Sequence, residues 1–154
     1  MYNYVVAIRD YKTDEPIALK EGETKNTPSN RFKQICKVDA KKYFDREVYI
    51  ELLYLIGGDY DKATARLIED TFRLYFLKKF GIDKVFKRDY FLTHNLPKEY
   101  DVEKEIEDIK NLILPFSGSG AKLLFTAKPN YISNIYCENK SMAVFKTWEK
   151  MGIE

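Results

Sequence analysis

Cysteine and histidine are scarce in this sequence, and their scarcity excludes several kinds of site. There are two cysteines, Cys36 and Cys137, and one histidine, His94. A disulfide scaffold or a zinc cluster needs more of them at close spacing, and two-histidine metal motifs are excluded. We expect the cysteines to be buried free thiols in a reducing cytosol, with a disulfide between them left open. His94 is expected on the surface, although any Ser-His-Asp or Cys-His site would have to use it.

Long apolar runs and an excess of charge of one sign are also missing. No segment approaches the roughly 18 apolar residues of a membrane-spanning helix, and Arg9 and Asp10 interrupt the first apolar run too early for a signal peptide. Lys and Arg number 26 and Asp and Glu number 24, so the net charge of +2 argues neither for nor against a nucleic-acid partner. We therefore expect no membrane partner and a cytoplasmic location, which is the host cytoplasm if the protein is viral.

Aromatic residues, in contrast, are plentiful. The chain has 12 Tyr and 10 Phe, so much of its core must be aromatic. Its 154 residues suit one domain, spanning residues 1–154. Abundant Lys, Glu, Tyr and Ile are typical of AT-rich genomes and thermophiles, and phages and archaeal viruses share this composition.

The hydrophobic pattern predicts strands that alternate with helices. A helix is expected at Asp61–Phe80, because Ile68, Phe72, Phe76 and Phe80 recur every four residues. We also expect helices at residues 102–113 and 141–151, strands at 4–8, 17–19, 48–56, 85–86, 123–127 and 132–137, and an exposed loop at 21–31. This order predicts an α+β (or α/β) domain in which about three helices pack on a single mixed sheet.

One glycine-containing segment has the form of an anion-binding loop. It comprises Ser117, Gly118, Ser119, Gly120 and Ala121. Two glycines separated by one residue let backbone N–H groups converge on an anion, as phosphate loops do. The alternative is a flexible loop between a helix and the strand that follows it.

A second segment, Gly57–Asp61, lies between an expected strand and the expected helix at Asp61–Phe80. Such a junction is a common phosphate site, because helix N-termini present free N–H groups. Asp59 and Asp61 would repel an anion there, so we favour a role for them as helix caps. The alternative is that Asp59 and Asp61 hold Mg²⁺, which prefers carboxylate oxygens.

Two further features are candidates for chemistry. Glu51 interrupts the apolar run 48–56, where burial would raise the pKa of its carboxyl and let it act as a general base. A solvent-facing position on a half-buried strand is the alternative for Glu51. Residues 31–46 are basic with interleaved aromatics and could track a nucleic-acid backbone, or they form an ordinary charged surface.

The last twenty residues, from Ile135 onward, resemble the late strand–helix unit of GNAT-type acyltransferases. The residues that carry this resemblance are Asn139, Ala143, Phe145, Lys150, Gly152 and Ile153. The segment Gly118–Leu124 also looks like the pyrophosphate-binding loop of that family, which leads into a helix. The resemblance implies the family's fold, dependence on acetyl-CoA, and cofactor contacts from residues 117–121 and from Asn139. The family's frequent Tyr general acid falls at Phe145, which cannot donate a proton.

Three functional hypotheses follow. The first is an acyl-CoA-dependent N-acyltransferase-like protein, active or degenerate, with Glu51 as the base that accepts a proton from a small-molecule or peptide amine. The second is a nucleic-acid-binding or nuclease-like accessory protein of a phage, archaeal virus or mobile element, using residues 31–46 and Mg²⁺ at Asp59 and Asp61. The third is a protein-interaction module that works through an aromatic surface.

Overall fold

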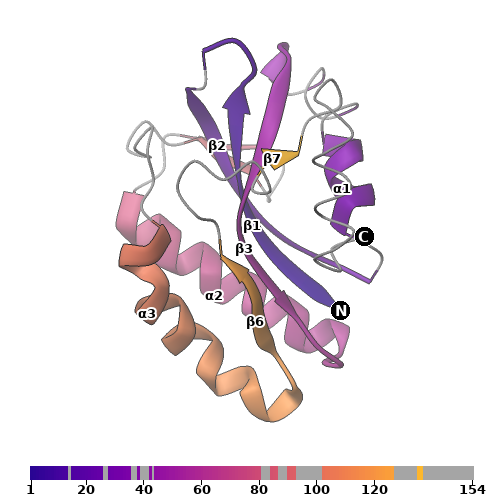
Figure 1. Cartoon of the computed structure of the whole chain (residues 1–154), viewed down its shortest axis with the longest axis vertical. Helices are drawn as coiled ribbons and strands as arrows, with labels where there is room; N and C mark the ends of the chain where they lie inside the picture. Colours follow the sequence, from indigo (N-terminus) through magenta and orange to yellow (C-terminus); the bar gives the residue numbers. More distant parts are fainter. Residues whose placement is uncertain are drawn as a thin grey trace.

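The structure, a computed structural model, describes residues 1–13, 15–25, 28–35, 38, 42, 44–80, 84–86, 90–92, 102–126 and 135–136. The elements, in chain order, are β1 (Tyr2–Asp10), β2 (Pro16–Thr24), α1 (Pro28–Gln34), β3 (Val48–Gly57), α2 (Lys62–Phe80), β4 (Lys84–Phe86), β5 (Tyr90–Leu92), α3 (Val102–Ile113), the 3-10 helix η2 (Leu114–Ser119), β6 (Lys122–Thr126) and β7 (Ile135–Tyr136) (Figure 1).

The strands form one sheet, in the order β4-β5-β2-β1-β3-β6, and β7 pairs with β3 beyond the end of β6. The prediction of an α+β fold with helices packed on one sheet is confirmed. All six described strand pairings are antiparallel, so the prediction that the sheet is mixed was wrong. Antiparallel neighbours need only a short turn between them, as between β1 and β2, whereas parallel neighbours need a long crossover.

The sheet separates two apolar cores. Helices α2 and α3 cover one face, and α1 lies on the other (Figure 1). On the first face, the predicted stripe of α2 is buried, and Phe76 stacks on Tyr54 of β3 with ring centroids 6.5 Å apart. On the second face, Phe32 of α1 meets the ring of Tyr4 edge-on at 5.2 Å. Strands β1 and β3 are therefore buried on both sides.

A β-bulge at Leu53 sets the side-chain alternation along β3. Val5 pairs with Tyr54 but Val6 pairs with Leu52, so Leu53 is the extra residue of the bulged strand. Leu53 and Tyr54 both join the core under α2, while Leu52 and Leu55 join the core on the α1 side. The bulge thus gives the α2 face two successive side chains from one strand.

The predicted loop at residues 21–31 was wrong at both of its ends. Strand β2 continues to Thr24, and Gly22 fits there because a Cβ at that position would overlap the ring of Tyr4. Helix α1 begins at Pro28, since the fixed φ of proline suits the first turn of a helix. Strands β1, β3, β4 and β6 and helices α2 and α3 were predicted, whereas β5 was not. The predicted helix at 141–151 lies outside the described residues.

In the part of the chain that the structure describes, no helix has both the length and the apolar character needed to cross a membrane.

Candidate functional site

The predicted anion loop is a closed 3-10 turn. The amide of Gly120 donates to the carbonyl of Ser117 at 3.0 Å, and the amide of Ala121 donates to the carbonyl of Phe116 at 3.3 Å. The Ser117 hydroxyl donates to the carbonyl of Leu114 at 2.8 Å. These amides are not the free, converging set that a diphosphate needs. The helix that the resemblance implies after Gly120 is instead strand β6, so that part of the prediction was wrong.

The glycines of the two predicted anion segments pack against each other. A Cβ at Gly58 would overlap the carbonyl oxygen of Gly120, so the backbones at this point approach too closely for any side chain. Gly120 has a φ of 90°, the left-handed conformation that glycine adopts at little cost. A Cβ at Gly118, in contrast, would meet no atom within 4 Å. Packing and turn geometry thus account for Gly58 and Gly120.

Asp61 caps α2, as predicted. Its carboxylate accepts a hydrogen bond from the amide of Thr64 at 2.8 Å, and this bond lowers the pKa of Asp61. Asp59 is exposed. Among the described residues, no group of three or more His, Cys, Asp or Glu is close enough together to hold a metal ion. Magnesium at Asp59 and Asp61 stays a prediction.

Glu51, the predicted base, is paired with a buried arginine. The sequence expectation was a carboxylate alone in an apolar run. In the structure, Arg9 of β1 donates to the Glu51 carboxylate at 3.3 Å, and the side chains of Arg9 and Glu51 are 4% and 23% exposed. The predicted cofactor loop, residues 117–121, ends next to Lys122, which pairs with Gly57 of β3. Glu51 lies six positions before Gly57 on the same strand, a distance of roughly 20 Å. The predicted base and the predicted cofactor loop therefore do not form one cluster.

A second buried ion pair was missed by the sequence analysis. Glu21 of β2 accepts a hydrogen bond from Nε of Arg73 on α2 at 2.8 Å, and the Glu21 side chain is 1% exposed. Burial raises the pKa of Glu21 to about 7, although Arg73 acts in the opposite direction. Little in the sequence indicates this pair. Lys20 and Glu21 follow Leu19 and precede Gly22, a polar pattern that is typical of a loop although these residues lie in β2.

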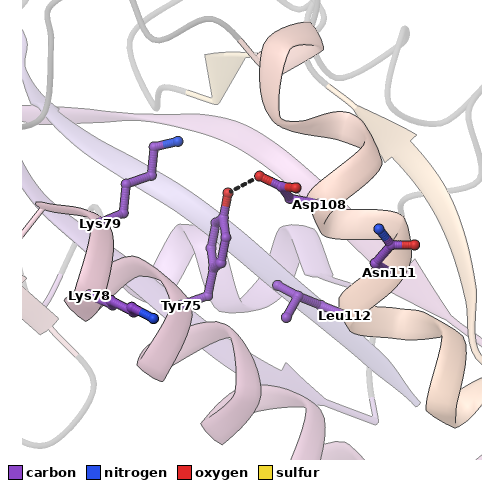
Figure 2. A pocket seen from close by; sticks show the side chains of 6 residues that line it. All are labelled: Tyr75, Lys78, Lys79, Asp108, Asn111 and Leu112. Carbon is purple, nitrogen blue, oxygen red and sulfur yellow. Dashed lines mark hydrogen bonds between the residues drawn. The ribbon is translucent and has the colours of Figure 1, made fainter.

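An open groove of about 470 Å³ lies between α2 and α3. This α2–α3 groove is lined by Tyr75, Lys78, Lys79, Asp108, Asn111 and Leu112. Figure 2 shows Tyr75 reaching from α2 toward Asp108 on α3, to which its hydroxyl donates at 3.2 Å. The Tyr75 hydroxyl also contacts Glu105, which pairs with Lys79. The two helices are thus joined by polar contacts beneath the groove, and Lys78 and Asn111 are exposed at its rim.

The remaining candidates are only partly described. His94, Asn139, Cys36, Cys137 and Phe145 lie outside the described residues. Within the basic stretch 31–46, Arg31 donates to Gln34 and Arg46 pairs with Asp10 at 3.4 Å. Nucleic-acid binding by this stretch stays a prediction.

Comparison with family models, curated proteins and solved structures gave no match to the chain. Acyl transfer from acetyl-CoA therefore stays a prediction, supported by the C-terminal resemblance alone. A thermal melt with and without acetyl-CoA tests it directly.

Proposed function

We propose that the protein is a protein-interaction module that docks an acidic amphipathic helix of another polypeptide against α2 and the α2–α3 groove. The observation that carries this proposal is the exposure of Leu67 and Leu74, which are 58% and 68% exposed. Phe72 and Phe76 of the same helix, in contrast, are 1% and 0% exposed. Single exposed leucines are common, but Leu67 and Leu74 lie on one side of the same helix, and Leu74 directly precedes Tyr75, which lines the groove, so the two leucines can form part of one interaction surface.

The spacing of the two leucines fits a helical partner. Leu67 and Leu74 are seven residues apart, close to two helical turns, so they lie on one side of α2 about 10 Å apart along its axis. A partner helix with apolar residues at heptad spacing repeats this distance. The groove beside them, with Tyr75 and Leu112 in its lining, offers room for a partner side chain.

The charges around the leucines favour an acidic partner. Lys62, Arg66 and Lys78 are exposed on α2, and none of them pairs with a carboxylate among the described residues. Asp70, the exposed carboxylate between the two leucines, is paired with Arg73 at 3.7 Å. Cations at the rim of an apolar patch attract a partner with acidic flanks and orient it. Leucines, unlike exposed aromatic planes, give nucleic-acid bases nothing to stack on, so the patch suits a polypeptide better than a nucleic acid.

A synthetic peptide tests the proposal. The probe is a fluorescent two-heptad amphipathic helix with leucines at heptad spacing and glutamates on both flanks, and binding is followed by fluorescence anisotropy. We expect wild-type protein to bind it, and Leu74→Glu to weaken binding at least tenfold. A peptide with lysines in place of the glutamates is expected not to bind.

The matched control is Leu124→Glu, which changes a leucine of similar exposure, 53%, on β6 outside the groove. Binding unchanged in this variant and lost in Leu74→Glu supports the proposal. Failure of the wild-type protein to bind the acidic peptide, or equal losses in the two variants, contradicts it.

A further inference from the structure

Glu21 is a buried carboxylate with one oxygen unused. Its Oε1 accepts the hydrogen bond from Arg73, whereas Oε2 accepts no hydrogen bond from any residue that the structure describes. An ionised carboxylate buried with an unsatisfied oxygen is costly, because it has given up its hydration without full replacement. The ionised form of Glu21 therefore destabilises the contact between β2 and α2.

The groups that face Glu21 come mainly from α2. Arg73 lies over it, and Arg73 also pairs with Glu69 at 3.0 Å and Asp70 at 3.7 Å on its own helix. On β1 the residue opposite Glu21 is the apolar Val5, and on β2 the adjacent Lys20 favours the ionised form through its charge. Arg73 thus keeps two carboxylates on α2 whether or not Glu21 is charged.

We propose that Glu21 and Arg73 make the attachment of α2 to the sheet sensitive to pH, firm when Glu21 holds a proton and loosened when Glu21 is ionised. A neutral Glu21 removes the buried charge, and Arg73 is then held by Glu69 and Asp70. An ionised Glu21 is stable only when it is hydrated or fully bonded, so it favours local opening of α2 that admits water. The device does not depend on a partner at the leucine patch.

The direction of the effect follows from the pKa. Burial raises the pKa of Glu21 from its ordinary value of 4.5 to about 7 in the folded protein. Below about pH 4.5 the carboxyl is protonated in both closed and open states, so opening releases no proton and the opening constant does not change with pH. As the pH rises to 7, the open state releases its proton first, and opening becomes progressively easier. Above pH 7 the change is complete.

The experiment combines a titration with hydrogen exchange on the intact protein. We expect the Glu21 side-chain carbon in ¹³C NMR to titrate with a midpoint near pH 7. The opening constants of α2 amides near Arg73, corrected for intrinsic exchange, are expected to rise on the order of a hundredfold between pH 5 and pH 8. Amides of α3, which packs on β6 rather than over the Glu21–Arg73 pair, are expected to change much less.

Two variants separate the device from general effects of charge. In Glu21→Gln the opening constants of α2 are expected to be the same at both pH values. Glu69→Gln removes another carboxylate that pairs with the same arginine, and it should keep the pH dependence. A Glu21 midpoint near 4.5, or equal pH responses of α2 and α3, overturns the proposal, and neither observation requires a variant to fold.

Discussion

The two buried ion pairs on the α2 face of the sheet are built in opposite ways. In the first, the acid is buried and the base is partly exposed: Glu21 is 1% and Arg73 28% exposed. In the second, the base is buried and the acid is partly exposed: Arg9 is 4% and Glu51 23% exposed. Both pairs join elements that are distant in the sequence, and Glu21 and Glu51 point to the same side of the sheet through the β1 register.

The difference shows which buried group can lose its charge. A buried carboxyl can take up a proton and become neutral near physiological pH, whereas a guanidinium stays charged at any such pH. Glu21 can therefore lose Arg73 at little cost when it is protonated, but Arg9 stays charged, and Glu51 stays one of its partners, at any such pH. We expect the Arg9–Glu51 pair to be structural and the Glu21–Arg73 pair to be conditional.

The largest effect is expected from Glu51→Ala, which leaves the guanidinium of Arg9 buried without this carboxylate. The free energy of unfolding should fall by roughly 3 kcal/mol, measured by urea denaturation at pH 7. The control is Arg46→Ala, which breaks the pair with Asp10. Because Arg46 is 53% exposed, its loss should cost less than about 1 kcal/mol. Equal costs for the two variants would mean that burial does not distinguish them.

The pH dependence of stability is expected to come from Glu21. Its pKa of about 7 in the folded state lies above the ordinary value of 4.5, so its contribution to stability is fully present below pH 4.5 and lost as the pH rises through 7. The free energy of unfolding should fall by roughly 3 kcal/mol from pH 4.5 to pH 8. The difference between wild type and Glu21→Gln, measured by urea denaturation across this range, isolates the effect. A constant difference between the two proteins would refute it.

A smaller effect is expected when Arg73 is replaced by Gln. At pH 5, where Glu21 is mostly protonated, the loss of stability should be about 1 kcal/mol or less. At pH 8 it should be larger, roughly 2 kcal/mol, because the ionised carboxylate then loses its charged donor. Thermal melts of wild type and variant at pH 5 and pH 8 compare the two losses of stability. A larger loss at pH 5 than at pH 8 would contradict the view that the Glu21–Arg73 pair matters only when Glu21 is ionised.

The smallest effect is expected from Lys110→Ala on the surface of α3. Lys110 pairs with Glu107 at 3.7 Å, and their side chains are 54% and 79% exposed. Removal of this pair should change the free energy of unfolding by less than about 0.5 kcal/mol at either pH. A change comparable to that of Glu51→Ala would show that exposure is not the deciding variable.

The sequence predicted the elements whose side chains repeat regularly. The four-residue spacing of Ile68, Phe72, Phe76 and Phe80 identified α2, and the apolar run from Val48 identified β3. It could not reveal β2 beyond Leu19, because Lys20 and Glu21 are polar residues that the fold buries. Local patterns report typical burial, and tertiary pairing overrode them here.

The candidate sites show the same limit more sharply. Glycines were predicted to bind an anion, but the close approach of two of them, Gly58 and Gly120, is explained by backbone packing. Glu51 was singled out as a carboxylate within an apolar run, yet its partner Arg9 is 42 residues away in the chain. The pairing register of β1 and β3, and the bulge that shifts it, decide which residues face each other, and neither can be read from a short stretch of sequence.

The bulge at Leu53 also bears on how the length of this chain can change. Residues on either side of Leu53 alternate between the two cores as they would in a regular strand without it. Loss of either of the adjacent leucines, Leu52 or Leu53, gives the same sequence and would leave Glu51 facing Arg9 and Tyr54 facing Phe76. Loss of a residue nearer either end of the strand would instead move the residues between that position and the bulge to the opposite face of the sheet. The bulge thus gives the centre of the sheet a place where the loss of one residue is in phase with the architecture.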